Sequence, residues 1–382
     1  MTFKPRDKCD PEDEGAVVCM RTSNVQTSLD QSDLIAIPGH LVKNPEKMIS
    51  AGDTLVSSAN SWNLVGKCCR VEDLQYPSTA GGFISILRPT SKELDSDYLY
   101  RWFSSEATQR RVRSFGNQTT NIANLNHKRT MKLRLPLPPI PKQKQIAAIL
   151  DAADELRSKR REALAQLDQL LQSTFLDMFG DPVTNPMGWE VGRLGDVCIG
   201  KPSYGSGAAA CEYSASLPRY VRITDIDEAG DLSDDPRSAI LSDSDIEKYR
   251  LSEGDVLFAR SGATVGKSYL HRTQHGFCVY AGYLIRFRPD PEILLPEVLF
   301  RFAHTQAFWR WVESHARAVA QPNINAKMYS ALRVILPPLD LQRRFVDIVG
   351  SIERQKAQHK VHLAELDTLF SSLQQRAFRG DL

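Results

Sequence analysis

Residues 124–150 read NLNHKRTMKLRLPLPPIPKQKQIAAIL, and residues 323–349 read NINAKMYSALRVILPPLDLQRRFVDIV. The two stretches align at a constant offset of 199 residues without a gap, and each runs from an amide-containing segment through a proline cluster into an apolar stretch. A repeat of this length is far too long for a solenoid. It indicates two copies of a unit in which one globular domain is followed by one long helix.

The proline clusters at 136–141 and 336–338 disfavour helix before them and give each helix a rigid entry. Beyond them the apolar residues follow a heptad spacing, which predicts a helix from Lys142 to Phe179, ended by Gly180, and a second helix at the C-terminus. The first would be roughly 55 Å long at 1.5 Å per residue. The predicted seam residues are Ile146, Ile149, Ala153, Leu156, Ala163, Leu167 and Leu170 in the first helix, and Phe345, Ile348, Ile352, Leu366, Leu369 and Leu373 in the second.

Neither seam can be buried alone, so we expect the two helices to pack on each other as an antiparallel, coiled-coil-like pair. The globular domains would then lie at opposite ends of a rod, related by a pseudo-twofold axis. The middle of the seam is polar, with Arg160 in the first helix and Gln355, His359 and His362 in the second. Either this layer fixes the register of the pair, or the helices diverge there and the side chains are solvated.

The predicted fold class is mixed α/β. The predicted boundaries are a first domain at 1–141, a central helix at 142–181, a second domain at 182–339 and a C-terminal helix at 340–382. Short stretches of alternating polarity predict strands at 53–57, 82–87, 220–223, 255–259 and 283–287. Helices are expected at 96–114 and 296–316.

The second copy opens with residues 188–200, which have no counterpart in the first copy if Lys4-Pro5 aligns with Lys201-Pro202. Either the chain starts late, or another segment completes the first domain. The pair Gly180-Asp181 recurs as Gly380-Asp381 at the C-terminus, so the repeat order is nearly circular.

The chain has 48 basic and 46 acidic residues, a net charge of +2, so binding to nucleic acid would have to rest on local clusters. Residues 98–134 carry eight basic residues and one acid, and residues 298–333 carry five and one. Each segment includes an amide-rich loop, and such side chains neutralise phosphates and read base edges. If only one basic patch were present, the simpler interpretation would be a solvated helix face, with Asn124 and Asn323 each capping a turn. The presence of two patches at equivalent positions in the two copies favours DNA binding. The candidate DNA-binding residues are Lys67, Arg113, Asn117, Gln118, Thr119, Lys128, Arg260, Ser261, Lys267, Arg317, Gln321 and Lys327.

The sequence gives little support for a nucleotide-binding, metal-binding or catalytic site. Residues 261–268 resemble a phosphate-binding loop but lack its first glycine, so a hairpin turn is favoured. The histidines lack metal-ligand spacing, and there is no Gly-x-Ser-x-Gly or Asp-Pro-Pro-Tyr motif. The seven cysteines include no Cys-x-x-Cys pair, which favours reduced cytosolic thiols. With no apolar run of about 18 residues and no secretory signal, we predict a non-catalytic chain without membrane span or metal.

The tandem order of variable domain, Leu-Pro-Pro entry, glutamine and leucine-rich helix resembles the specificity subunit of Type I restriction–modification systems. The residues that carry the resemblance are Leu137-Pro138-Pro139-Ile140 with Gln143, Leu336-Pro337-Pro338-Leu339 with Gln342, and the stretch 254–262. The resemblance implies two target recognition domains, each reading one half of a split DNA sequence, with the helices setting the spacing. This chain itself would hold no cofactor.

The same resemblance implies the partners. They are double-stranded DNA, two modification subunits that bind S-adenosylmethionine and methylate a flipped adenine, and restriction subunits that use ATP and Mg, all in the cytoplasm. The alternative from another class is a non-enzymatic coiled-coil scaffold whose domains bind protein.

Overall fold

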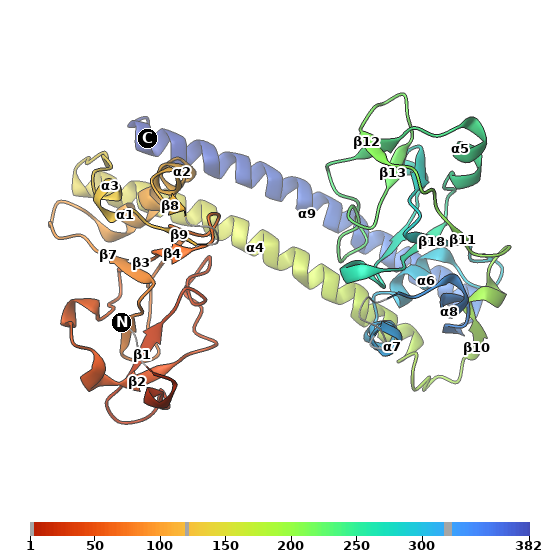
Figure 1. The fold of residues 1–382 in the computed structure, drawn as a ribbon, viewed down its shortest axis with the longest axis horizontal. Coiled ribbons are helices and arrows are strands. Elements are labelled where there is room, and N and C mark those ends of the chain that lie inside the picture. Colours follow the sequence, from red (N-terminus) through yellow and green to blue (C-terminus); the bar gives the residue numbers. More distant parts are fainter. Residues whose placement is uncertain (1–3, 119–121, 317–322) are drawn as a thin grey trace. The chain divides into compact units, whose positions relative to one another are not determined.

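The computed structural model describes residues 4–118, 122–316 and 323–382. The chain divides into two compact units: unit 1 comprises Met1–Arg161 with Val361–Leu382, and unit 2 comprises Glu162–Lys360. Two long helices, α4 (Ile140–Phe179) and α9 (Leu339–Arg379), each contribute one part to each unit (Figure 1). Both end at a glycine with positive φ, Gly180 at 77° and Gly380 at 92°, as predicted for the first helix.

Over its described residues, the globular part of unit 1 forms three small sheets and three short α-helices. The sheets have the strand orders β2-β1-β6, β5-β3-β7 and β4-β9-β8. The strands are β1 (Ala16–Met20), β2 (Ala36–Pro38), β3 (Thr54–Ser57), β4 (Ala59–Asn60), β5 (Cys68–Arg70), β6 (Ser78–Ala80), β7 (Ile84–Leu87), β8 (Asn117–Gln118) and β9 (Ala123–Asn124). The helices are α1 (Ser96–Phe103), α2 (Glu106–Ser114) and α3 (His127–Thr130).

Unit 2 repeats this plan with added strands. Its sheets have the orders β10-β19, β11-β18-β15-β16 and β12-β14-β13-β17. The strands are β10 (Glu190–Arg193), β11 (Ser203–Tyr204), β12 (Ala210–Glu212), β13 (Arg219–Val221), β14 (Arg237–Ala239), β15 (Val256–Ala259), β16 (Ser268–Leu270), β17 (Cys278–Tyr280), β18 (Leu284–Phe287) and β19 (Arg333–Leu336). The helices are α5 (Asp243–Tyr249), α6 (Pro296–Phe302), α7 (Gln306–Ala316) and α8 (Ala326–Ser330). The predicted mixed α/β class is therefore confirmed.

Each predicted domain helix is in fact two helices. Residues 96–114 form α1 and α2, and residues 296–316 form α6 and α7. The break lies at Ser105 in unit 1 and at Thr305 in unit 2, where the hydroxyl accepts a hydrogen bond from the backbone N–H three residues on, that of Thr108 or Phe308. Such a side-chain cap starts a new helix in a different direction, and apolar periodicity alone does not reveal it.

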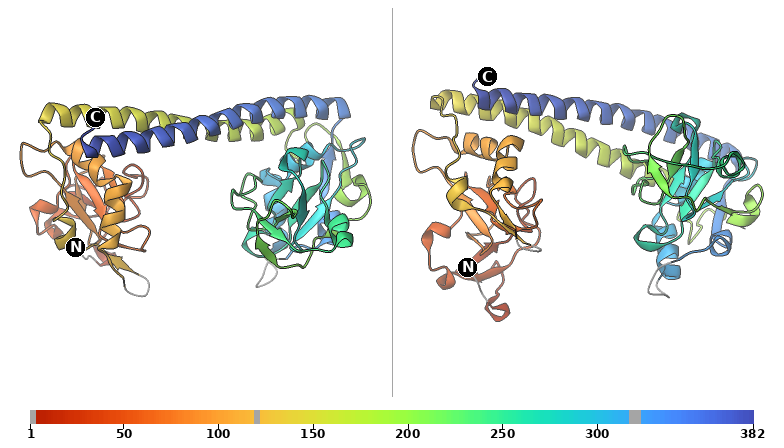
Figure 2. Two further views of the ribbon diagram at one scale, coloured as in Figure 1. Left: turned by 90° about the horizontal axis from the view of Figure 1, so that it is seen from above. Right: turned by 45° about the horizontal axis from the view of Figure 1, so that its top comes forward.

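Inside each unit the segments of α4 and α9 run antiparallel, as predicted. In unit 1 Arg157 Nε lies 2.6 Å from Asp367 Oδ1, and Ile146 and Leu150 share a core with Phe370 and Ala377. In unit 2 the rings of Phe175 and Phe179 pack on Phe345, with centroid distances of 5.7 and 4.9 Å. The globular part of each unit lies on one side of its helix segments (Figure 2).

The predicted seam was wrong at four of its thirteen residues, and the other nine are buried or half-buried. One continuous series of buried and half-buried positions runs through 146, 150, 153, 157, 160, 164, 167 and 171 in α4, and through 345, 349, 352, 356, 359, 363, 366 and 370 in α9. The second series equals the first plus 199. The predicted seam residues Leu156, Leu170, Ile348 and Leu369 are instead 54%, 46%, 42% and 49% exposed. Arg157 takes a seam position because its guanidinium lies 4.2 Å from the Phe370 ring centroid and pairs with Asp367.

A buried glutamine fastens each domain to its helix. Gln143 Oε1 accepts a hydrogen bond from the Asp95 N–H at 2.9 Å, and its amide donates to the carbonyls of Glu93 and Pro138, both at 2.7 Å. Gln342 makes the equivalent bonds with Leu295, Ile293 and Pro337 at 2.8, 2.9 and 2.8 Å. Both glutamines are fully buried, so the two glutamines of the sequence pattern are structural clamps.

The two units differ in two of their sheets. In unit 2, β10 pairs with β19 and β11 pairs with β18. Among the described residues of unit 1, no strand pairs with residues 134–137 or with the outer edge of β7.

Candidate nucleic-acid interface

In unit 1 a short sheet brings two of the predicted DNA-binding segments together. Strand β4 pairs with β9, with Ala59 opposite Asn124, and the Leu125 N–H donates to the Ser58 carbonyl at 2.8 Å. Strand β8 pairs with the other side of β9. The turn that follows β4 therefore lies beside the amide-rich segment, and the Trp62 ring lies over Gly116, 3.6 Å from where a Cβ would stand.

Unit 2 repeats this juxtaposition with different side chains. Ser261 forms a bridge with Asn323, and the Ile324 N–H donates to the Arg260 carbonyl at 2.8 Å. The Arg260 guanidinium lies 4.9 Å from the centroid of the Tyr204 ring. Its Nε is buried and has no hydrogen-bond partner within the part of the chain that the structure describes. An arginine held on an aromatic face in this way keeps its terminal nitrogens directed for hydrogen bonding to a ligand.

Tyr204 is a candidate that the sequence reasoning missed. It is 39% exposed, and its hydroxyl accepts a hydrogen bond from the Ala326 N–H at 3.0 Å, beside the start of α8. Tyr204 lies 56 positions before Arg260, in β11, and no repeat pattern marked it, because unit 1 has no strand equivalent to β11 among its described residues.

Two of the predicted lysines occupy equivalent exposed positions. Lys128 in α3 and Lys327 in α8 are exposed and stand 199 residues apart. Their helices are capped by Asn126 and Asn325, whose Oδ1 atoms accept from the N–H of Arg129 at 3.1 Å and of Met328 at 3.0 Å. The alternative that Asn124 and Asn323 act as caps was therefore wrong, because both are exposed and the caps lie two residues further on.

Two other predicted lysines are held inside the domains. Lys67 Nζ donates to Gln26 Oε1 at 2.5 Å. Lys267 Nζ donates to the Ile226 carbonyl at 3.2 Å and lies 2.9 Å from Glu228 Oε1, with its side chain 16% exposed. Each ammonium has three N–H donors, so these contacts orient the two lysines within their own domains.

Of the remaining candidates, Arg113 is half-buried at the end of α2, and Ser261 is half-buried at the bridge to Asn323. Asn117 and Gln118 contribute the backbone of β8. Thr119, Arg317 and Gln321 lie outside the described residues.

The loop at 261–268 is part of a hairpin between β15 and β16, as predicted, and Gly266 is needed for packing. It adopts φ 90°, and a Cβ there would stand 2.9 Å from Val312 Cγ1. Gly66 has φ 83° and would place a Cβ 2.8 Å from Val112 Cγ1. In the Gly-Lys pair that suggested a phosphate-binding loop, the glycine thus allows the hairpin to approach α2 in unit 1 or α7 in unit 2 closely.

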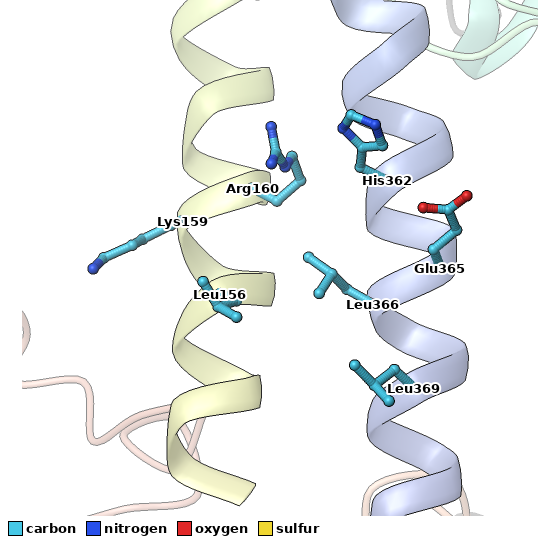
Figure 3. A pocket seen from close by; sticks show the side chains of 7 residues that line it. All are labelled: Leu156, Lys159, Arg160, His362, Glu365, Leu366 and Leu369. Carbon is cyan, nitrogen blue, oxygen red and sulfur yellow. The ribbon is translucent and has the colours of Figure 1, made fainter. Parts of the chain in front are cut away.

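The register shift leaves an apolar groove on the helices within unit 1. A groove of about 770 Å³ is lined by Leu156, Lys159, Arg160, His362, Glu365, Leu366 and Leu369. Figure 3 shows Arg160 and His362 directed toward each other between the helices, and Leu156, Leu366 and Leu369 directed into the same space. Exposed leucines beside charged side chains are typical of a surface that binds another helix.

The polar part of the seam also contains defined ion pairs. Lys356 Nζ lies 2.7 Å from Asp168 Oδ1 in unit 2, which is the counterpart at offset 199 of the Arg157–Asp367 pair in unit 1. Arg160 and His359, the residues predicted to form a central layer, are half-buried. The charge pairs that flank them support the interpretation that the polar residues fix the register.

The described residues offer little for catalysis or metal binding. They contain no group of three or more His, Cys, Asp or Glu side chains that could hold a metal ion. The seven cysteines are unpaired, and burial raises the pKa of the Cys278 thiol to about 11 and that of Cys198 to about 12. No helix in residues 4–118, 122–316 or 323–382 is long and apolar enough to cross a membrane.

Comparison with known proteins assigns this architecture to a family. The Type I restriction modification DNA specificity domain matches residues 3–167 and 186–367. The specificity subunit of the EcoKI type I restriction enzyme from Escherichia coli K12 is 23% identical and covers 100% of this chain and 86% of its own length. The StySPI specificity subunit from Salmonella potsdam has the same identity and the same two coverages.

Solved structures share the fold. A chain from a study of complex assembly and conformational transition in the type I R-M system has a TM-score of 0.55 at 21% identity, covering 98% of this chain and 95% of its own. The S subunit of the Type I system from M. genitalium also has a TM-score of 0.55, at 14% identity, covering 99% and 91%.

Proposed function

The chain belongs to the Type I restriction modification DNA specificity domain family, and from this premise we propose that its two globular domains each read one half of a bipartite DNA target. The chain acts as the DNA specificity subunit of a type I complex and performs no catalysis itself. It works in the cytoplasm on double-stranded DNA. A coiled-coil scaffold whose domains bind protein is not favoured, because the family and the relatives are DNA specificity proteins.

The observation that supports this proposal is the duplicated loop constellation. In both units a backbone hydrogen bond ties the hairpin after the central strand to the segment before α3 or α8: Leu125 to Ser58, and Ile324 to Arg260. In both, an exposed lysine follows one helical turn later, Lys128 or Lys327. The scaffold is the same and the surface side chains differ, as expected of two domains that position DNA alike but read different bases.

The groove on the helices supports the proposed partners. We place a modification subunit on the exposed leucines and charged residues that line it, and a second on the equivalent surface of unit 2, where Leu170 is the exposed counterpart of Leu369. The modification subunits supply S-adenosylmethionine chemistry on a flipped adenine, and restriction subunits supply ATP- and Mg-dependent translocation and cleavage. This chain determines which DNA sequence is recognised and provides the surface on which the other subunits assemble.

The experiment is methylome sequencing of cells that express the chain with its modification subunits. We expect adenine methylation at a motif of two short specific halves separated by a non-specific spacer. A continuous motif, or no motif from an assembled complex, would contradict the proposal.

A binding experiment separates DNA from a protein partner. The assembled complex should lose affinity for its target steeply as salt rises, because phosphate contacts release counterions. An affinity that hardly changes between 50 and 200 mM salt would favour the protein scaffold.

A further inference from the structure

In unit 2 a loop that follows β13, residues 226–232, reaches the long helix α9. Asp231 Oδ2 lies 2.6 Å from Lys360 Nζ of that helix. Gly230 has φ 83°, and a Cβ there would stand 2.6 Å from Phe300 Cζ, so the loop packs directly on α6. The loop therefore joins the globular part of unit 2 to its long helix through a ring contact and an ion pair.

The equivalent loop of unit 1 is two residues shorter. Its ends are Val25 and Leu29, which form the bridge that Ile226 and Leu232 form in unit 2. Three residues, 26–28, thus stand where unit 2 has five. The difference lies inside the chain, between β1 and β2.

A cavity of about 1110 Å³ lies between the shorter loop and α4. Four of its lining residues have counterparts close to the loop of unit 2. The pairs are Tyr100 and Phe300, Arg101 and Arg301, Arg157 and Lys356, and Arg161 and Lys360. The cavity therefore carries one aromatic ring and three cations at positions equivalent to those around the longer loop.

In unit 2 these cations stabilise a carboxylate. Burial acts to raise the pKa of Asp231, but the hydrogen bond from Lys360 and the charges of Lys356 and Arg301 outweigh it and lower the pKa. A negative charge is therefore favoured beside these three cations.

In unit 1 the loop offers no such charge, because residues 26–28 are Gln, Thr and Ser. Arg161 Nη2 instead lies 3.0 Å from Asp367 Oδ1, the same oxygen that Arg157 Nε contacts at 2.6 Å. The Arg161 side chain is 47% exposed, and a guanidinium has five N–H donors. Arg161 can therefore bind a further carboxylate.

Five acids also line the cavity, and four of them are paired with a cation. The pairs are Asp154 with Arg101 at 2.8 Å, Glu72 and Asp151 with Arg70 at 2.6 and 3.1 Å, and Glu155 with Lys159 at 2.7 Å. The fifth, Asp73, accepts a hydrogen bond from the Leu74 N–H at 2.8 Å. The favourable side for an entering carboxylate is therefore that of Arg161.

We propose that this cavity of unit 1 binds an acidic turn of a partner polypeptide. A glycine of the turn packs on Tyr100, and the aspartate that follows it places its carboxylate on Arg161. Gly230 and Asp231 have these two roles in unit 2. The occupant is a turn rather than a small anion, because unit 2 uses the ring contact together with the ion pair. The inference goes beyond the proposed function and does not depend on DNA recognition.

The probe is a cyclic peptide with the sequence of residues 225–233, titrated into the full chain by calorimetry. In unit 2 the Ser233 N–H donates to the Asp225 carbonyl at 2.8 Å, and Asp227 Oδ1 accepts from the Asp231 N–H at 2.8 Å. The ends of the segment therefore meet, and its own contacts hold the turn. The matched peptide carries Asp231→Asn. We expect the parent peptide to bind and the matched peptide to bind about tenfold more weakly.

Three chain variants locate the binding site. Arg161→Glu should weaken binding of the parent peptide by at least about tenfold, because it sets like charges against each other. Arg161→Lys keeps the positive charge, as at the equivalent position of unit 2, and should bind within about threefold of the original chain. Lys144→Glu makes the same reversal of charge at an exposed position of α4 and should leave binding unchanged.

A loop graft supplies the turn within the chain itself. Replacing residues 26–28 by the sequence of residues 227–231 should fill the cavity and prevent binding of the cyclic peptide. A grafted chain that binds the peptide as the original does would contradict the proposed site.

The proposal is overturned if the parent peptide does not bind, if both peptides bind equally, or if Arg161→Glu has no effect. Two further arms test the occupant. Acetate at the concentration of the peptide should not compete, and competition would assign the cavity to a small carboxylate instead. A chain that sediments as a monomer supports a partner polypeptide, whereas a dimer that the peptide dissociates would assign the cavity to a second copy.

Discussion

The two units share their attachment to the helices and differ in their sheets. Gln143 and Gln342 make the same three hydrogen bonds, and Asp53 pairs with Arg88 as Asp255 pairs with Arg288. By contrast, strands β10 and β11 of unit 2 have no counterpart among the described residues of unit 1. The two copies are therefore more alike in the contacts that join each domain to its helix than in the strands at the edges of their sheets.

The ion pairs of the two long helices also occupy equivalent positions in the two units. Arg157–Asp367 in unit 1 and Lys356–Asp168 in unit 2 occupy equivalent positions, and so do the pairs that Arg101 makes with Asp154 and Arg301 with Glu353. The sign of the charge is the same at all four pairs of equivalent positions, while the residue type differs at two of them, Arg157/Lys356 and Asp154/Glu353. We infer that the position of the charge matters to the helix packing more than the chemistry of the individual side chain.

The largest effect should come from the glutamine clamps. Gln342→Leu leaves one buried N–H and two carbonyls without partners, at about 1–3 kcal/mol for each unsatisfied group, so we expect a loss of about 3 kcal/mol or more from unit 2. Gln143→Leu should do the same to unit 1. Urea denaturation gives the total, and hydrogen exchange followed by mass spectrometry assigns it to a unit. Gln145→Leu, an exposed position on the same helix, is the control; equal losses from Gln145→Leu and Gln143→Leu would refute the clamp.

The seam ion pairs should differ in strength between the units. Lys356 is 6% exposed, and Asp168→Asn leaves it only Glu353 at 3.3 Å. We expect a cost of about 1–2 kcal/mol, between the values for exposed and buried pairs. Asp367→Asn should cost under about 1 kcal/mol, because Arg157 is 18% exposed and keeps Asp154 at 2.8 Å and the Phe370 ring. The reverse order in chemical denaturation would contradict this comparison.

The units should also respond differently to mild acid. In unit 2, His271 and His275 both bond the Tyr269 hydroxyl, at 3.1 and 2.8 Å. Burial lowers the pKa of each, while Glu253 acts in the opposite sense on both, together with Asp255 on His271 and Asp231 on His275. Their folded pKa values lie below the unfolded value, so the stabilisation is complete above about pH 6.5 and is lost as the pH falls below it. The histidines His40, His127 and His362 of unit 1 are exposed.

We therefore expect the free energy of unfolding of unit 2 to fall more than that of unit 1 between pH 7 and pH 5. Hydrogen exchange at both pH values, corrected for intrinsic rates, measures the difference. His271→Gln should flatten the pH dependence of unit 2. An unchanged slope in this variant would show that the histidine pair is not the cause.

The smallest effect should come from single lysines at the proposed DNA interface. In the assembled complex, Lys128→Ala and Lys327→Ala should each reduce the slope of log affinity against log salt by about 0.9, the value for one phosphate contact. Lys92→Ala, an exposed lysine of unit 1 away from these segments, is the control. An effect at one position and none at the other would mean that the equivalent lysines have diverged in role.

The sequence alone predicted the duplicated units and the two long helices, because both rest on a repeat that covers many residues. It did not predict the seam register. Ile149 stands beside Leu150 and Leu170 beside Leu171, so apolar spacing supports both choices, and only the Phe370 ring and Asp367 explain Arg157 in the seam. Tyr204 was missed because the contact that matters joins residues 56 positions apart, and periodicity carries no information on such contacts.

The central claim is that each domain reads its own half of the target. The most direct test replaces residues 4–138 by a second copy of residues 186–337, joining at the equivalent prolines Pro138 and Pro337, and compares the methylated motif with that of the original chain. We predict a bipartite motif in which both halves carry the sequence of the present second half. An assembled complex that still methylates the original first half would contradict the account.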